Sequence, residues 1–559
     1  MEEKSRLKWV DILKSFGIFA VAFGHIYRQE NVLCWLYTFH VPLFFIAGGI
    51  VFRPSEILRN IKRRAFRILV PYAVFGVLMA LYFSLIEYRW RDISMSLPDC
   101  LLGLVIGATI ASAVFAFPGD FAAAGAGSGA VLVGWLITGI GMLGLCLAFY
   151  YLNKLKPELK GGVYSYARAG FGSYVGFNSA WGYWLSELLS NISFLTLLFA
   201  SVGQFLPLFG VGNNIPSVIG MSVVWWIAII LVLRGTKEST AVNLVSTIAK
   251  IIPILVLIVV IIFARAFSFE TFMQNFSGSE GGMSFGKQVM ATTTTTVWAF
   301  TGIEGAVVIS GRAKRSSDVG RATVIGFLSV LILYIIISFL SAGVMTNEEL
   351  AALGNPPMAG ILEHVVGPWG AALVNIAVII SLLGATLGHT IMCTECPYEA
   401  AKSGAFCKAF TRTNKNGAPV FAIVLTSIIA QVFLVLLYFN ESTYQVFYFF
   451  ATGMIMVPYF LSAMYFCKVA LKQENGLIKG IGIFNAVYAV WMVFAAGISV
   501  MLATVLLYVP GIFVYAKGQK EKGLKVFETK VDKAVFVALL ALLVICIYFV
   551  ATGRINPLG

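Results

Sequence analysis

The sequence consists largely of apolar runs that are long enough to cross a lipid bilayer. A transmembrane helix needs about 20 predominantly apolar residues, and about sixteen runs in this chain reach that length. Hydrophobic residues make up 59% of the 559 positions and charged residues 12%, more apolar surface than a soluble core of this size could bury. We therefore expect an all-α polytopic membrane protein.

The expected spans form two series. Three lie in the first hundred residues, near 9–27, 33–52 and 67–88. The first contains Asp11 and Lys14, so it does not resemble a cleaved signal peptide, and the chain is expected to remain in the cell membrane as a multi-pass protein. The second series lies near 101–124, 129–151, 176–207, 216–233, 240–264, 286–311, 322–345, 369–396, 420–438, 444–467, 481–500, 501–516 and 534–552.

The net charge of +14 comes from short basic clusters between these runs. That pattern reports membrane orientation, with basic loops on the cytoplasmic side, and does not indicate a nucleic-acid partner. In the second series basic loops alternate with neutral ones, and this alternation predicts that residue 101 lies on the cytoplasmic side. The basic loop of the first series is at 53–67, and if that loop is cytoplasmic, the first series ends on the outer side. Either one N-terminal segment does not span the membrane, or the two parts, residues 1–97 and residues 98–559, did not evolve as one architecture.

The eight cysteines lack the paired spacing of a disulfide scaffold. Cys393 and Cys396 have metal-ligand spacing, but no second pair completes a tetrahedral site. We expect neither a metal nor a cofactor.

The segment WAFTGIEGAVV (298–308) places Glu304 between two glycines inside an apolar run. A carboxylate at this depth is costly in lipid and usually faces a cavity or a pathway. Gly302 and Gly305 weaken the helix and free backbone polar groups, as in the broken helices that surround a transporter's substrate. The alternative is a helix contact through the glycines, with Glu304 paired at a buried interface.

A second interrupted span, VIGATIASAVFAFP (105–118), lies five spans earlier. This spacing predicts an inverted five-helix repeat whose first and sixth helices are broken at the binding site, preceded by about three extra apolar helices.

Residues 101–559 resemble the amino acid–polyamine–organocation transporters, and within them the arginine/ornithine antiporters. The resemblance is carried by several ordered motifs: IGATIASAVFAFP, GGVYSYARAGFG, LVLRGTKE, WAFTGIEGAVVISGRAKRSSDVGRATVIGF and ECPYEAAKSGAF.

The resemblance implies a set of substrate-binding residues. Two segments, Ala111-Ser112-Ala113 and Thr301-Gly302-Ile303, are expected to hold the substrate's α-carboxylate and α-amino group. Trp298 is expected to pack on its cationic side chain, and Asn191 to face it. Glu304 matches an acidic residue associated with gating or proton coupling.

The sequence departs from the family pattern in two ways. Ala111 and Ala113 stand where the first bend usually has glycines, and His389 stands where relatives often have tryptophan. The second departure affects the distal gate and the substrate; a lone membrane histidine is also compatible with a structural role.

Residues 6–52 resemble the beginning of the membrane acyltransferase-3 family. The family's signature is a basic residue, ten further residues and then a histidine, and Lys14 and His25 match it. The segment FHVPLFFIAGG, which contains His40, matches a second family feature. The two residues of the first pair stand about 16 Å apart along a helix, too far for one hydrogen-bonded dyad. The match covers about a quarter of such an enzyme, so residues 1–97 are expected to be a remnant without catalysis.

The sequence thus predicts a secondary transporter, not an enzyme, that exchanges arginine for ornithine. The alternatives are a lysine/cadaverine or arginine/agmatine antiporter, a proton-coupled permease and a membrane O-acyltransferase. The expected partners are cationic amino acids and membrane lipid, and a homodimer is left open.

Overall fold

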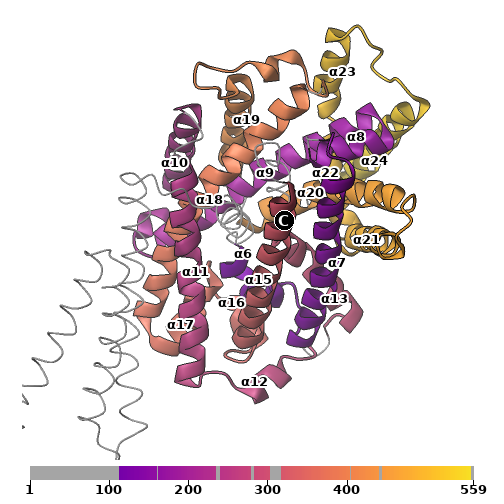
Figure 1. Ribbon diagram of the computed structural model, residues 1–559. Helices are drawn as coiled ribbons and strands as arrows, with labels where there is room; N and C mark the ends of the chain where they lie inside the picture. Colours follow the sequence, from indigo (N-terminus) through magenta and orange to yellow (C-terminus); the bar gives the residue numbers. More distant parts are fainter. Residues whose placement is uncertain are drawn as a thin grey trace, which may run out of the picture. The chain divides into compact units, whose positions relative to one another are not determined.

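The structure is a computed structural model that describes residues 113–159, 162–234, 239–278, 282–302, 316–402, 404–439 and 444–554. Side chains are described for the same residues except 113, 239–249 and 316–323. In these ranges the chain is helical, and its only β interaction is an isolated bridge between Thr413 and Pro419 (Figure 1). The predicted all-α class is confirmed.

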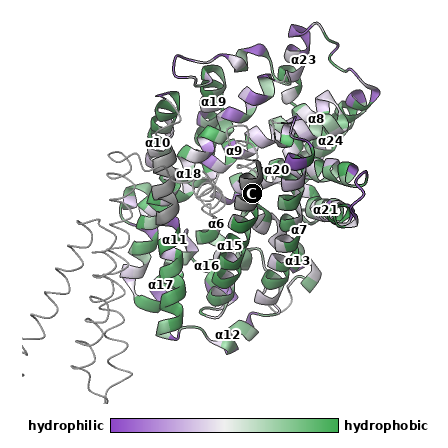
Figure 2. Ribbon diagram, viewed as in Figure 1, coloured by the Kyte–Doolittle hydropathy of each residue, from purple (hydrophilic) through white to green (hydrophobic). Residues whose placement is uncertain are grey.

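Nine helices in the described ranges are long and apolar enough to cross a membrane, and the bent pair α22–α23 raises the number to ten. Together with shorter helices, they place a helix at every predicted span of the second series. Hydrophobic residues predominate on the long helices, whereas hydrophilic residues gather on α23 and the loop that follows it (Figure 2). The chain is therefore a multi-pass membrane protein; the three predicted N-terminal spans lie outside the described residues.

Two successive sets of helices, each with five helices at predicted spans, have the same order. Each set has a short helix, a long helix, one or two short helices, a very long helix and two further helices. The first set is α6 (Ala113–Ala123), α7 (Ser128–Leu155), α8 (Val163–Phe171), α9 (Ser173–Gly203), α10 (Ile215–Arg234) and α11 (Ser239–Ala264). The second is α13 (Phe285–Trp298), α15 (Ser316–Ala342), α16 (Asn347–Ala352), α17 (Pro357–Val366), α18 (Pro368–Lys402), α19 (Val420–Tyr438) and α20 (Tyr444–Ala470).

Packing between the sets is reciprocal. Helix α9 packs against α20, and its counterpart α18 packs against α11. Likewise α10 packs against α18 and α19 against α9, while α7 contacts α13 and α15 contacts α6. Equivalent helices five spans apart cross the membrane in opposite directions, so reciprocal pairing is what an inverted repeat requires.

The remaining elements lie outside the repeat. Four helices follow the second set, and short helical segments lie between other helices. They are η3 (Pro207–Phe209), α12 (Phe269–Gln274), η6 (Lys408–Thr411), α21 (Gly476–Ala495), α22 (Ile498–Tyr508), α23 (Gly511–Glu521) and α24 (Lys530–Ala551). In its most apolar window α24 is only 6% buried by the protein, as suits a helix surrounded by lipid.

Helix α9 is the centre of the bundle. Its most apolar window is 94% buried, and it contacts both α18 and α20. Small residues allow this closeness: a Cβ added to Gly182 would stand 2.9 Å from the Met454 carbonyl oxygen on α20 and would overlap the Tyr508 hydroxyl. Helices in membranes commonly approach one another at such small residues.

The predicted break in the sixth span is present. Helix α13 ends at Trp298, and a turn follows it. Gly302 has a φ of +99°, a conformation that L-residues with a side chain rarely adopt. The predicted break in the first span falls on residues that the structure does not describe, and α6 begins immediately after them.

Candidate functional site

Aromatic side chains gather at the end of the broken helix. Trp298 is 1% exposed and stacks on Tyr448 of α20, with ring centroids 4.4 Å apart and an interplanar angle of 17°. Phe194 of α9 also lies near Trp298, with the centroids of the two rings 6.2 Å apart. The Tyr448 hydroxyl is 3.4 Å from the Thr295 hydroxyl on α13. The break is thus enclosed by aromatic surface from three helices.

One face of α9 is directed toward this region. Glu187, Asn191 and Phe194 follow one another at intervals of four and three residues, which places them on the same side of a helix. Phe194 contacts both Trp298 and the imidazole of His389, whose ring centroid is 4.9 Å away in an edge-to-face arrangement. The α9 face therefore connects the broken helix with α18.

The most polar contact on this face is a buried acid–imidazole pair. His389 Nδ1 lies 2.6 Å from Glu187 Oε2, and the two side chains are 4% and 0% exposed. Ionisable side chains at such depth are usually paired and often mark a transport pathway. The predicted gating residue His389 therefore has a definite partner on α9.

Several buried polar atoms on this face of α9 and in the turn after Trp298 have no hydrogen-bond partner among the described residues. They include Glu187 Oε1, Asn191 Oδ1 and Thr301 Oγ1. The Asn191 amide nitrogen donates to the Glu187 carbonyl oxygen one turn earlier, at 3.1 Å. A buried acceptor without a partner is costly, so this grouping favours a ligand that supplies hydrogen-bond donors.

A second buried carboxylate joins the two halves of the repeat. Asp120 of α6 is 4% exposed and accepts hydrogen bonds from the Tyr444 hydroxyl at 2.5 and 2.6 Å and from the Gln445 amide at 2.9 Å. Tyr444 is one turn before Tyr448 on α20, and their rings are 5.5 Å apart. Asp120 therefore fixes the end of α20 that carries the stacked tyrosine.

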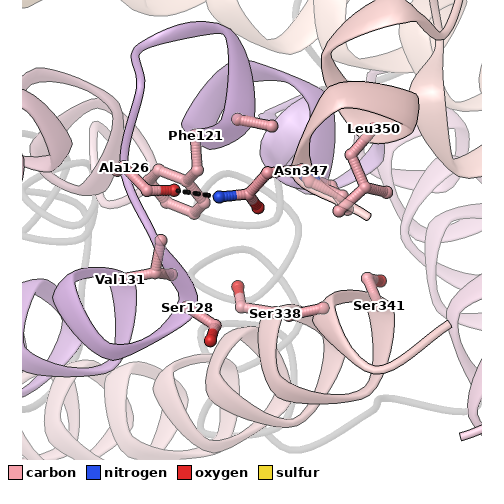
Figure 3. Close-up of a pocket in the computed structure, with 11 residues that line it drawn as sticks. Phe121, Ala126, Ser128, Val131, Ser338, Ser341, Asn347 and Leu350 are labelled. Atoms are coloured by element: carbon pink, nitrogen blue, oxygen red, sulfur yellow. Dashed lines mark hydrogen bonds between the residues drawn. The ribbon is translucent and has the colours of Figure 1, made fainter. Parts of the chain in front are cut away.

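A small cavity of about 20 Å³ lies where α6, α7, α15 and α16 meet (Figure 3). Its lining includes Ser338, which accepts a hydrogen bond from Trp135, and Asn347, which donates to the Ala126 carbonyl oxygen. The Ser341 hydroxyl has no protein partner in the described part of the chain. The volume fits one water molecule and is too small for an amino acid, so this cavity is not the substrate site.

The cysteines of the CTEC segment serve packing. Cys393 and Cys396 are buried on α18, and their thiols donate to the carbonyl oxygens of Trp184 and Ala180 on α9, at 3.5 and 3.7 Å. Their spacing places both on the α9-facing side of α18.

Of the predicted binding and gating residues, Trp298 and His389 both contact Phe194, and Asn191 lies one turn before Phe194 on α9. Thr301 and Gly302 lie in the turn that follows Trp298. Nothing can be placed for Ala111, Ser112, Ile303, Glu304 or the acyltransferase-like Lys14, His25 and His40, which lie outside the described residues. Ala113 begins α6, and its side chain is not described.

Two carboxylates escaped the sequence interpretation, Glu187 and Asp120. Each stands inside a predicted span, and Glu187 is the only acidic residue of α9. The rule applied to Glu304, that an intramembrane carboxylate marks a site, would have selected both.

Comparison with known proteins gives a consistent set of relatives. A sequence model of the amino acid permease family matches residues 101–519. The arginine/ornithine antiporter of Pseudomonas aeruginosa is 43% identical over 457 residues, which are 78% of this chain and 93% of that protein. The L-lysine transport protein of Corynebacterium glutamicum is 38% identical, over 77% of this chain and 90% of that protein. The arginine/agmatine antiporter of Chlamydia pneumoniae is 36% identical, over 82% of this chain and 97% of that protein.

Proposed function

This chain belongs to the amino acid permease family, and we propose that it exchanges cationic amino acids across the plasma membrane, importing arginine as ornithine leaves. The observation that carries the proposal is the group of aromatic rings at the break after Trp298, together with buried polar atoms that have no hydrogen-bond partner among the described residues. Relatives named for arginine, ornithine, lysine and agmatine support the substrate class.

The site residues suit the parts of such a substrate. The end of α13 and the turn at Thr301-Gly302 offer backbone polar groups for the α-carboxylate and α-ammonium groups. The Trp298 ring offers a face for the cationic side chain, and Asn191 offers an amide oxygen. Exchange of two monovalent cations moves no net charge, so the concentration ratios of the two amino acids suffice to drive it.

The function is tested by arginine uptake into liposomes that contain the purified full-length protein. We expect labelled arginine to enter ornithine-loaded liposomes and not empty ones, without dependence on a proton gradient. Uptake into empty liposomes that requires a proton gradient would instead indicate a permease. Exchange only with internal lysine or agmatine, and not ornithine, would reassign the substrate pair.

We further propose that residues 1–97 are a separate acyltransferase-3-like segment without catalysis. The family match covers residues 101–519 and includes none of this segment. A chain lacking residues 1–97 should therefore retain the exchange of the full chain. Transfer of labelled acetyl groups from acetyl-CoA to membrane sugars by the full chain would contradict the assignment.

Replacement of Trp298 by leucine should weaken the apparent affinity for arginine by about 1–2 kcal/mol, roughly 5- to 30-fold, because the cation loses its aromatic face. The measurement is the arginine concentration for half-maximal exchange. Trp225 of α10 is also fully buried, and Trp225→Leu serves as the control for loss of a buried indole. An unchanged affinity in Trp298→Leu would remove this residue from the site.

A further inference from the structure

We infer that Glu187 binds the cationic end of the substrate side chain and sets the selectivity for cationic over neutral amino acids. This inference rests on the proposed function and adds a residue to its site. The carboxylate is completely buried on the face of α9 that also carries Asn191 and Phe194, opposite His389 and close to the break after Trp298.

The hydrogen bonding of the Glu187 carboxylate is incomplete. Oε2 contacts the His389 imidazole, whereas Oε1 has no hydrogen-bond partner in the residues that the structure describes. Burial of half of a carboxylate without donors is costly. A purely structural ion pair would be expected to satisfy both oxygens, as the Asp120 carboxylate does with Tyr444 and Gln445.

The neighbouring groups also require donors. The Asn191 amide oxygen, one turn along α9, and the Thr301 hydroxyl are buried without partners in the same part of the described structure. A guanidinium group carries five donors and an alkylammonium group three, and neither has an acceptor. Both groups complement a carboxylate and an amide oxygen, and a guanidinium can also donate to a carboxylate through two parallel bonds.

The aromatic side chains offer an apolar surface for a long cationic side chain. Phe194 touches both the His389 ring and Trp298, so it spans the distance between the Glu187 carboxylate and the break. A substrate with its α-groups at the break would direct its side chain along Phe194 toward Glu187. His389 then acts as a positioning residue that holds one carboxylate oxygen and leaves the other for the cation.

The test compares arginine with citrulline, in which a neutral ureido group replaces the guanidinium. Both are measured as external substrates of ornithine-loaded liposomes, for the wild type and for Glu187→Gln, which keeps the shape and removes the charge. We expect the preference for arginine over citrulline to fall at least tenfold in Glu187→Gln, equivalent to about 1.4 kcal/mol. Ser201→Ala, which removes another buried hydroxyl of α9, should leave the preference unchanged.

A second variant keeps the inference testable if Glu187→Gln does not fold. In His389→Gln the carboxylate remains, so arginine should still be preferred over citrulline by a factor within threefold of wild type. Loss of the preference in His389→Gln would assign recognition to the imidazole and overturn the inference. An unchanged preference in folded Glu187→Gln would overturn it as well, while leaving the proposed exchange intact. A wild type that favours citrulline, or transports neither, would overturn both.

Discussion

Asp120→Ala should destabilise the folded transporter by about 2–4 kcal/mol, because it leaves the buried Tyr444 hydroxyl and the partly buried Gln445 amide without their charged acceptor. The Tyr444 hydroxyl and the Gln445 amide both donate to this carboxylate, which joins the first helix of one half to the fifth helix of the other. Transport should also slow, since Tyr444 and Tyr448 share the segment of α20 that stacks on Trp298. Denaturant unfolding in detergent and initial exchange rates measure the two effects.

Asp120→Asn separates shape from charge at the same position. The amide keeps an acceptor for Tyr444, so its loss of stability should be less than half that of Asp120→Ala. Asp532 provides a matched buried carboxylate outside the repeat: it caps α24 and accepts from Thr529 and from the Tyr174 backbone. Asp532→Ala should lower stability without altering the apparent affinity for arginine. Wild-type stability in Asp120→Ala would show that the contact with α20 contributes nothing.

The helical class and the span positions could be predicted because the bilayer admits few alternatives. An apolar run of about 20 residues has to satisfy its backbone hydrogen bonds internally, and a helix does so whatever its neighbours are. The break after Trp298 was also predictable, because two closely spaced glycines weaken a helix locally. The hydropathy pattern does not predict which helices pack together. The pairing of α9 with α20 and of α18 with α11 follows only from the predicted inverted repeat.

The contacts around the candidate site could be predicted only in part. The sequence indicates Trp298, Asn191 and His389, and the structure places Trp298 and His389 against Phe194, with Asn191 one turn before it on α9; their roles in binding remain predictions. The partner of His389 could not be read from the sequence, because Glu187 is 202 positions away and the contact depends on how α9 and α18 lie together. The stack of Trp298 on Tyr448 likewise joins helices from distant parts of the chain, whereas the contact of Trp298 with a cation remains a prediction.

Gly182→Leu should cost about 3 kcal/mol or more of stability, because α9 has no room for a side chain at this position. A Cβ would overlap the Tyr508 hydroxyl, which donates to the Met454 carbonyl oxygen, and would itself lie 2.9 Å from that oxygen. The backbone of α20 cannot move aside as a flexible side chain would, so α9 and α20 must separate. Unfolding in denaturant and the yield of monodisperse protein measure the effect.

Gly480 of α21 is the matched control, since a Cβ at this helical glycine meets nothing within 4 Å. Gly480→Leu should therefore leave stability within about 0.5 kcal/mol of wild type. Separation of α9 from α20 would also move Glu187 and Asn191 away from Tyr448, so folded Gly182→Leu should show weaker arginine exchange. Equal stability of the two variants would mean that α9 and α20 do not approach each other as closely as the Gly182 contact requires.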